Sequence, residues 1–280
     1  MACGGTVSQH QWHDLPPQVR TEIARKTGDV RSVQVTSAGS VAAFTATIDA
    51  GHGTYFCKGA PTTAGPALRA ARIEARLNPH LPEALVPRLR WTIEAAGWVV
   101  LGFDVCPGRH ADLRPGSSDL PAVAATLTKL AAALTPCPLQ VQPATARWGA
   151  WINPDLVDGD TLAHTDVTSK NFLVVDRVVH VVDWAMPVRG AAWIDTARMI
   201  VRLIRAGHSP GQAEQWARGV PAYSAAPAPT ITAFAHAAAK LNAHRRRQRA
   251  AEHVNQLASA AAAWSAFRSA GETETYTLRY

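Results

Sequence analysis

The 280-residue sequence has little cysteine and no long apolar run. Its four cysteines are scattered without a Cys-x-x-Cys spacing, which argues against a zinc site or a disulfide framework and predicts reduced thiols. No apolar stretch approaches the length of a bilayer-spanning helix, and the N-terminus lacks a basic segment followed by a hydrophobic one. These absences predict a cytoplasmic protein with no membrane partner.

Acidic residues are also few, because 21 Asp and Glu stand against 28 Lys and Arg. This excess permits a nucleic-acid or anionic-membrane partner, or a basic surface around a site for a nucleoside triphosphate. The densest basic run, at 244–249, lies in an Ala-rich helical stretch and is typical of a solvated helix face. It has no interleaved aromatic residues for base stacking, which argues against a nucleic-acid partner.

The order of the expected elements predicts an α+β fold with two lobes. Strands are expected at 30–36, 41–49, 54–59, 89–93 and 98–103, with helices at 14–27 and 66–78. Beyond a Pro-Gly break at 107–108, helices dominate, at 120–134, 196–206, 210–219 and, in two pieces, 230–270. We therefore expect an N-terminal lobe, 1–103, with an antiparallel sheet plus helix, and a larger, mainly helical C-terminal lobe, 104–280.

The most informative stretch is 162–184, LAHTDVTSKNFLVVDRVVHVVDW. Its two apolar runs, 172–175 and 178–182, predict short buried strands joined by a turn. Asp166 and Asn171 precede this hairpin and Asp183 ends it, so the fold-back is expected to gather the three side chains. A single Asp near a turn is usually a solvated cap, but three polar residues at this spacing predict a polar cluster.

Such a cluster suits phosphoryl transfer. The attacking hydroxyl needs an acceptor for its proton, and a triphosphate needs Mg²⁺ held by oxygen ligands. Asp166 is the candidate catalytic residue, while Asn171 and Asp183 are the candidate metal ligands. An Asp followed five residues later by an Asn, and then by a metal-binding Asp, is also the spacing found in protein kinases.

The motif, H-x-D-x-x-x-x-N followed by V-V-D-W, resembles the aminoglycoside phosphotransferase family and its kinase-like relatives more closely than protein kinases. Thr165 stands where protein kinases have the Arg of H-R-D, and Trp184 and Ala185 replace the Phe-Gly of D-F-G. The resemblance implies a protein-kinase-like fold, with ATP, or GTP as the second choice, and Mg²⁺. It also implies that His164 supports the catalytic loop and that Asp195 stabilises it, which we interpret as N-capping the helix that follows.

Lys58 ends an expected strand, and Glu74 lies on the helix that follows. A strand lysine is usually an exposed edge residue, and Arg72 or Arg76 could pair with Glu74 on the helix surface. In kinases, however, a strand Lys paired with a helix Glu positions the α- and β-phosphates. The order along this chain matches, so we assign both residues to nucleotide binding.

Two further parts of the N-terminal lobe are candidate nucleotide contacts. Gly39 and Ser40 occupy the first hairpin turn, and in the resembling family the equivalent loop covers the triphosphate with backbone amides and often a Ser. Phe103 and Val105 lie in the expected hinge, whose main-chain groups would receive the adenine edge.

The acceptor is the least defined part. From residue 196 onward, 4 acidic residues stand against 11 basic ones, which argues against a strongly cationic acceptor because buried ammonium groups require carboxylate partners. Asp155, Asp158 and Asp160 could still line the mouth, although a solvated turn is the simpler interpretation. We expect a small-molecule hydroxyl acceptor, either a natural-product antibiotic, in resistance or self-protection, or a sugar-like metabolite.

Two alternatives remain open from the sequence. One is a kinase-like protein that binds nucleotide without transferring phosphate, although each essential side chain is present. The other is a nucleic-acid-binding protein that uses the basic run at 245–249. A protein substrate is disfavoured because the chain lacks the long activation segment and the A-P-E signature.

Overall fold

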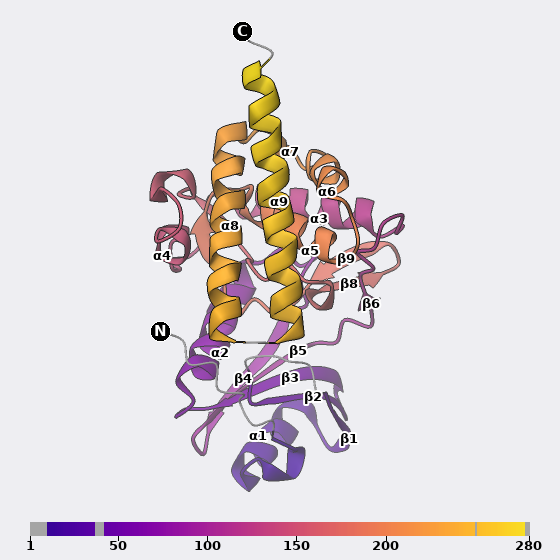
Figure 1. Cartoon of the computed structure of the whole chain (residues 1–280). Helices are drawn as coiled ribbons and strands as arrows, with labels where there is room; N and C mark the ends of the chain where they lie inside the picture. The colour runs from indigo at the N-terminus through magenta and orange to yellow at the C-terminus, as the bar shows by residue number, and fades with distance from the viewer. Residues whose placement is uncertain (1–9, 37–41, 250, 278–280) are drawn as a thin grey trace. The chain divides into compact units, whose positions relative to one another are not determined.

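The computed structural model describes residues 10–36, 42–249 and 251–277, with no side chains described beyond residue 271 (Figure 1). The chain forms two compact units. Unit 1 consists of Met1–Pro107 and His180–Met186, and unit 2 consists of Gly108–Val179 and Pro187–Tyr280. Unit 1 therefore contains a short second segment from far along the chain.

Unit 1 is built on a five-stranded antiparallel sheet with strand order β1-β2-β3-β5-β4. The strands are β1 (Val30–Val35), β2 (Phe44–Ala50), β3 (Gly53–Pro61), β4 (Leu89–Ala95) and β5 (Trp98–Asp104). Helix α1 (Pro17–Thr27) precedes the sheet, and α2 (Gly65–Leu77) follows β3. Because β3 lies between β2 and β5, Lys58 is on a central strand and not on an edge.

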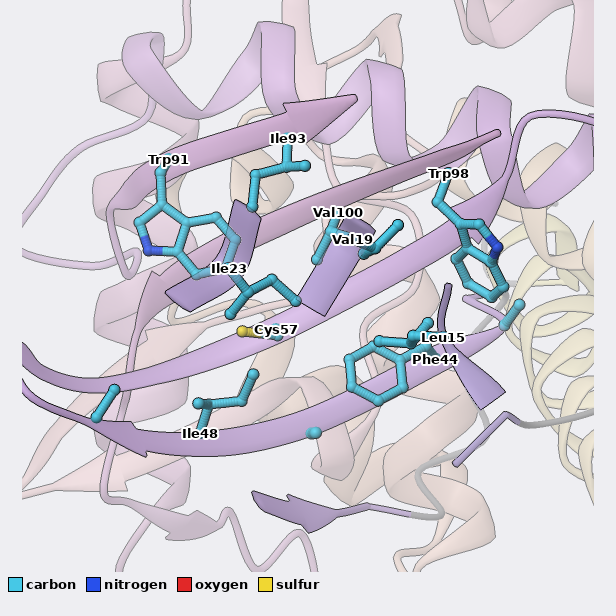
Figure 2. Packing of buried hydrophobic residues seen from close by; sticks show 13 residues of the cluster. Leu15, Val19, Ile23, Phe44, Ile48, Cys57, Trp91, Ile93, Trp98 and Val100 are labelled. Atoms are coloured by element: carbon cyan, nitrogen blue, oxygen red, sulfur yellow. The ribbon is translucent and has the colours of Figure 1, made fainter. Parts of the chain in front are cut away.

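One face of this sheet packs against α1. Val19 and Ile23 of the helix are fully buried there against strand residues that include Phe44, Cys57 and Val100 (Figure 2). Trp91 completes this core by lying over the backbone of Gly102, where a Cβ atom would be 2.1 Å from the ring. Only glycine leaves room for this contact.

The opposite face carries a second apolar cluster, which includes Leu101 of β5 and Ala71 of α2. Successive strand residues point to opposite faces of a sheet. Since Cys57 belongs to the α1 side, Lys58 points to the α2 side, where it is paired in register with Leu101. The alternation of β3 thus directs the lysine towards the helix that carries Glu74.

Unit 2 is mainly helical. Its helices are α3 (Leu120–Ala133), α4 (Ala144–Trp148), α5 (Ile194–Arg205), α6 (Pro210–Ala217), α7 (Pro221–Ser224), α8 (Ala228–Gln248) and α9 (Glu252–Thr277). Helices α8 and α9 run side by side (Figure 1). Around Phe234 of α8 lie the rings of Trp148, Trp193 and Trp264, at centroid distances of 5.6, 5.0 and 6.4 Å. The predicted start of α6 is confirmed, because Ser209 and Gln212 form a reciprocal capping box.

Short strands also lie in unit 2. They are β6 (Arg109–His110), β7 (Thr161–Ala163), β8 (Phe172–Val175), the start of β9 (Val178–Val181) and β10 (Val188–Gly190). β7 pairs with β10, and β6 with β8. The turn between β8 and β9 places Asp176 and Arg177 at φ values of 47° and 67°.

No helix in the described ranges has the length and apolar character needed to cross a bilayer.

Candidate active site

In unit 1, Lys58 lies between two carboxylates. Its Nζ donates to Glu74 Oε1 at 2.8 Å, to Glu74 Oε2 at 3.1 Å and to Asp183 Oδ1 at 2.7 Å. The Lys58 and Glu74 side chains are 10% and 7% exposed, whereas Asp183 retains 25%. Glu74 is therefore buried and paired with Lys58, and it is not the surface partner of Arg72 or Arg76.

The electrostatics of this triad favour a charged lysine. Burial alone would lower the pKa of Lys58, but the charges and hydrogen bonds of Glu74 and Asp183 outweigh burial and raise the pKa above its ordinary value. With both carboxylates ionised, the triad carries one positive and two negative charges. The surplus negative charge on the more exposed member, Asp183, suits a divalent cation.

In unit 2, the loop between β7 and β8 carries Asp166. Its side chain is 43% exposed, while its backbone is held on both sides. The Asp166 amide donates to His164 Nδ1 at 3.1 Å, and Thr168 N donates to the Asp166 carbonyl at 2.9 Å. His164, only 1% exposed, therefore supports the loop by accepting this hydrogen bond, as the resemblance implied.

Thr165 stands at φ 66°, in the left-handed region that non-glycine residues rarely adopt. Asp183, in unit 1, has the same φ of 66°. Such backbone strain is found where the surrounding structure fixes a functional geometry. At Thr165 the fixing contacts come from Asp195, whose two carboxylate oxygens each accept a backbone N–H, from His164 and from Thr165, at 2.7 Å.

The expectation that Asp195 caps its own helix is wrong. α5 begins at Ile194 with Trp193 as N-cap, so Asp195 lies inside the first turn. Its carboxylate instead accepts hydrogen bonds from the backbone N–H groups of His164 and Thr165, in the loop that carries Asp166. Asp195 thus stabilises the loop as expected, through its own hydrogen bonds to the loop backbone and not by capping a helix.

Asn171 is buried next to Asp166. Its Nδ2 donates to the Asp166 carbonyl at 2.8 Å and to the Asp166 carboxylate at 3.0 Å. Both amide hydrogens are thereby used, and Oδ1 remains as the atom type that Mg²⁺ prefers. Hard oxygen donors are thus present on Asn171 in unit 2 and on Asp183 in unit 1. Each of these donors, taken by itself, is of the oxygen type that suits Mg²⁺, which takes few protein ligands and binds substrate phosphates for the rest.

Sequence reasoning did not identify the arginines around Asp166. Arg202 Nη2 lies 3.5 Å from Asp166 Oδ1, and Arg147 donates to the Thr165 hydroxyl. Arg147 and Arg198 lie against the ring of Trp148, at 5.6 and 5.7 Å from its centroid. Two signals were available in the sequence. One was the surplus of basic residues from position 196 onward, and the other was the i, i+4 spacing of Arg198 and Arg202, which puts both on one face of α5.

The remaining candidate contacts are less defined. Gly39 and Ser40 lie outside the described residues. Phe103 is buried in β5, with its ring centroid 6.0 Å from Lys58 Nζ, and Val105 is half-buried just after the end of that strand. Their contacts with a nucleotide stay a prediction.

No protein-family model matches the sequence, and no curated protein matches it. Solved structures do match in fold. Choline kinase LicA from Streptococcus pneumoniae superposes with a TM-score of 0.55 at 12% identity, over 89% of this chain and 98% of LicA. LicA in complex with AMP gives a TM-score of 0.56 at 10% identity, over 90% and 98%.

A provisionally named aminoglycoside phosphotransferase from Ralstonia eutropha gives a TM-score of 0.57 at 11% identity, over 90% of this chain and 97% of its own. These matches confirm the expected α+β, kinase-like fold, with its antiparallel N-terminal sheet and helical C-terminal part. The chain has the fold of the aminoglycoside phosphotransferase-like kinases.

Proposed function

We propose that this chain is an ATP-dependent phosphotransferase that moves the γ-phosphate to a hydroxyl group of a small molecule. The observation that carries the proposal is the ordered pairing of Lys58 with Glu74 and Asp183, together with a separate loop in which Asn171 buttresses Asp166. Enzymes that transfer phosphoryl groups act mostly by positioning the reactants and by stabilising the charge on the phosphates. The Lys58 triad suits charge stabilisation, and the Asp166 loop suits positioning of the acceptor hydroxyl. The fold shared with a choline kinase supports the same conclusion.

In the proposed reaction, the acceptor oxygen attacks the γ-phosphorus. A new oxygen–phosphorus bond forms while the bond to the bridging oxygen of ADP breaks. Asp166 accepts the hydroxyl proton, and its exposure leaves the carboxylate accessible to an acceptor. Lys58 neutralises the non-transferred phosphates, and Glu74 orients the ammonium group. Asp183 and Asn171 would hold Mg²⁺, which supplies charge neutralisation of the phosphates.

The acceptor that we propose is a natural-product antibiotic or a sugar-like metabolite. Support comes from the names of the fold neighbours, which include a choline kinase and a provisionally named aminoglycoside phosphotransferase. AMP is bound in one LicA structure, which supports an adenine nucleotide as donor here.

The test is a screen of hydroxyl compounds with magnesium-ATP, read by a mass gain of one phosphoryl group. Asp166→Ala should lower kcat by about 10²–10⁴-fold, the usual contribution of a positioned acid or base. Glu252→Ala, at an exposed acidic residue of the same unit, is the matched control and should change kcat little. Transfer that survives Asp166→Ala unchanged would rule out the mechanism, and ATP binding without any transfer would favour the nucleotide-binding alternative.

A further inference from the structure

Four arginines from three helices gather around the catalytic loop of unit 2. They are Arg147 of α4, Arg198 and Arg202 of α5, and Arg245 of α8; we call them the arginine cluster. Three of them line one cavity of about 30 Å³, together with the ring of Trp148. Arg202 reaches Asp166 itself, so the cluster borders the proposed proton acceptor.

The cluster holds more positive than negative charge. The carboxylates that act on it electrostatically are Asp166 and Asp195. Four guanidinium groups against two carboxylates leave an excess of two positive charges. Asp195 is further committed to two backbone N–H groups of the loop.

This arrangement is unfavourable for the protein alone. Burial, followed by the charges of Arg202, Arg147 and Arg245, lowers the pKa of Arg198 to about 9. Within the described part of the chain, no acceptor pairs with the buried Nε of Arg198. Buried donors without acceptors and close like charges both cost free energy, so an anion bound here would relieve both costs.

The cluster can be reached from solvent. Arg245 is exposed, and the Arg202 side chain keeps 15% of its surface. By contrast, Arg246 and Arg247 lie on the same helix, are exposed and do not line the cavity. The run at 244–249 is therefore not uniform, because Arg245 lines the cavity whereas Arg246 and Arg247 do not.

We propose that the arginine cluster binds an anionic group of the acceptor, so that the substrate is a hydroxy compound carrying a phosphate, sulfate or carboxylate. The inference rests on the proposed function and narrows its acceptor class. Guanidinium groups bind oxyanions through paired hydrogen bonds, which would also orient the hydroxyl towards Asp166. A cationic acceptor would meet the positive excess and be repelled.

The test compares matched acceptors with magnesium-ATP: glycerol against glycerol 3-phosphate, glucose against glucose 6-phosphate and gluconate, and kanamycin as a cationic compound. Wild type should show a kcat/KM at least ~10-fold higher for the anionic members, in keeping with charged hydrogen bonds. Arg198→Gln and Arg245→Gln should each reduce that value about 10–100-fold, mainly through the KM of the acceptor. The KM for ATP and the rates with neutral acceptors should change less than about threefold. Arg246→Gln is the matched control.

A second readout needs no correct acceptor. Sodium sulfate should raise the Tm of wild type more than sodium chloride does at equal ionic strength, and this difference should shrink in Arg245→Gln, a surface change that leaves folding intact. Transfer preferring kanamycin or neutral acceptors, or arginine variants that raise the KM for ATP and the acceptor alike, would overturn the inference while leaving the transferase intact. Arginine-dependent protection by sulfate with no transfer to any acceptor would retain the anion site and reject the transferase.

Discussion

Lys58 and Asp183 are 125 residues apart in the sequence, yet the lysine Nζ lies 2.7 Å from the aspartate carboxylate. The contact is within unit 1, because His180–Met186 returns to that unit after the first part of unit 2. The same ammonium group also binds Glu74, so one cation holds together a strand, a helix and the returning segment.

Removing this cation should destabilise unit 1. Lys58→Met removes the ammonium group that Glu74 and Asp183 share, and breaking a buried charge pair from one side costs about 3–5 kcal/mol. Urea unfolding monitored by circular dichroism measures the change. Lys26→Met, at an exposed lysine of α1, should stay within about 0.5 kcal/mol. Equal effects of the two variants would contradict the structural role of Lys58.

The same lysine should make stability depend on alkaline pH. Its pKa is raised in the folded state, so the folded chain binds the proton more tightly than the unfolded chain. The contribution is fully present below the unfolded pKa of about 10.4 and is lost as pH rises towards the folded pKa. The difference in unfolding free energy between wild type and Lys58→Met should therefore be constant from pH 8 to about pH 10 and shrink by pH 11. A difference that widens between pH 8 and about pH 10 would indicate a folded-state pKa below the ordinary value.

Asp195 should act through the loop and not through its helix. Asp195→Ala removes the acceptor of two backbone N–H groups and should cost about 1–3 kcal/mol in stability together with a fall in kcat. Asp195→Asn keeps one acceptor oxygen and should lie between wild type and Asp195→Ala in both measurements. If the residue were only an N-cap, stability would fall while kcat of the folded enzyme stayed unchanged.

Gly102 should tolerate no side chain. A Cβ atom would lie 2.1 Å from the Trp91 ring, so Gly102→Ala should destabilise unit 1 by about 1–3 kcal/mol through overpacking. An added Cβ at Gly271, in α9, would meet no described atom within 4 Å beyond the adjoining helix backbone, and Gly271→Ala should be neutral or stabilising. Thermal unfolding of both variants tests the opposite signs, and a neutral Gly102→Ala would show that Trp91 moves freely.

Much of the fold and part of the site were predictable because the signals are local. Alternating apolar residues defined the strands of unit 1, and the spacing of Asp166 and Asn171 placed both on one loop. The burial of Lys58 on β3 could not be predicted from the neighbouring sequence. It depends on β5 and α2, which come later in the chain. The kinase resemblance supplied that information.

The arginine cluster was missed for a related physical reason. Arg147, Arg198 and Arg245 come from three helices far apart in sequence, and each alone looks like a solvated basic residue. The surplus of basic residues after position 196 was visible, but which of them face inward depends on helix packing. Asp195 was misassigned because its partners are backbone N–H groups of another segment, which leave no side-chain signal.

The return of His180–Met186 to unit 1 has a consequence for synthesis on the ribosome. A nascent chain that ends at Pro107 lacks Asp183 and also the hydrogen bond from Val181 N to Leu85 O. At roughly 5–20 residues per second, the rest of unit 1 waits about 4–16 s for this segment to be translated. During that interval Lys58 can pair with Glu74 but not with Asp183, so the contact between Lys58 and Asp183 forms only after the Asp166 loop has been synthesised.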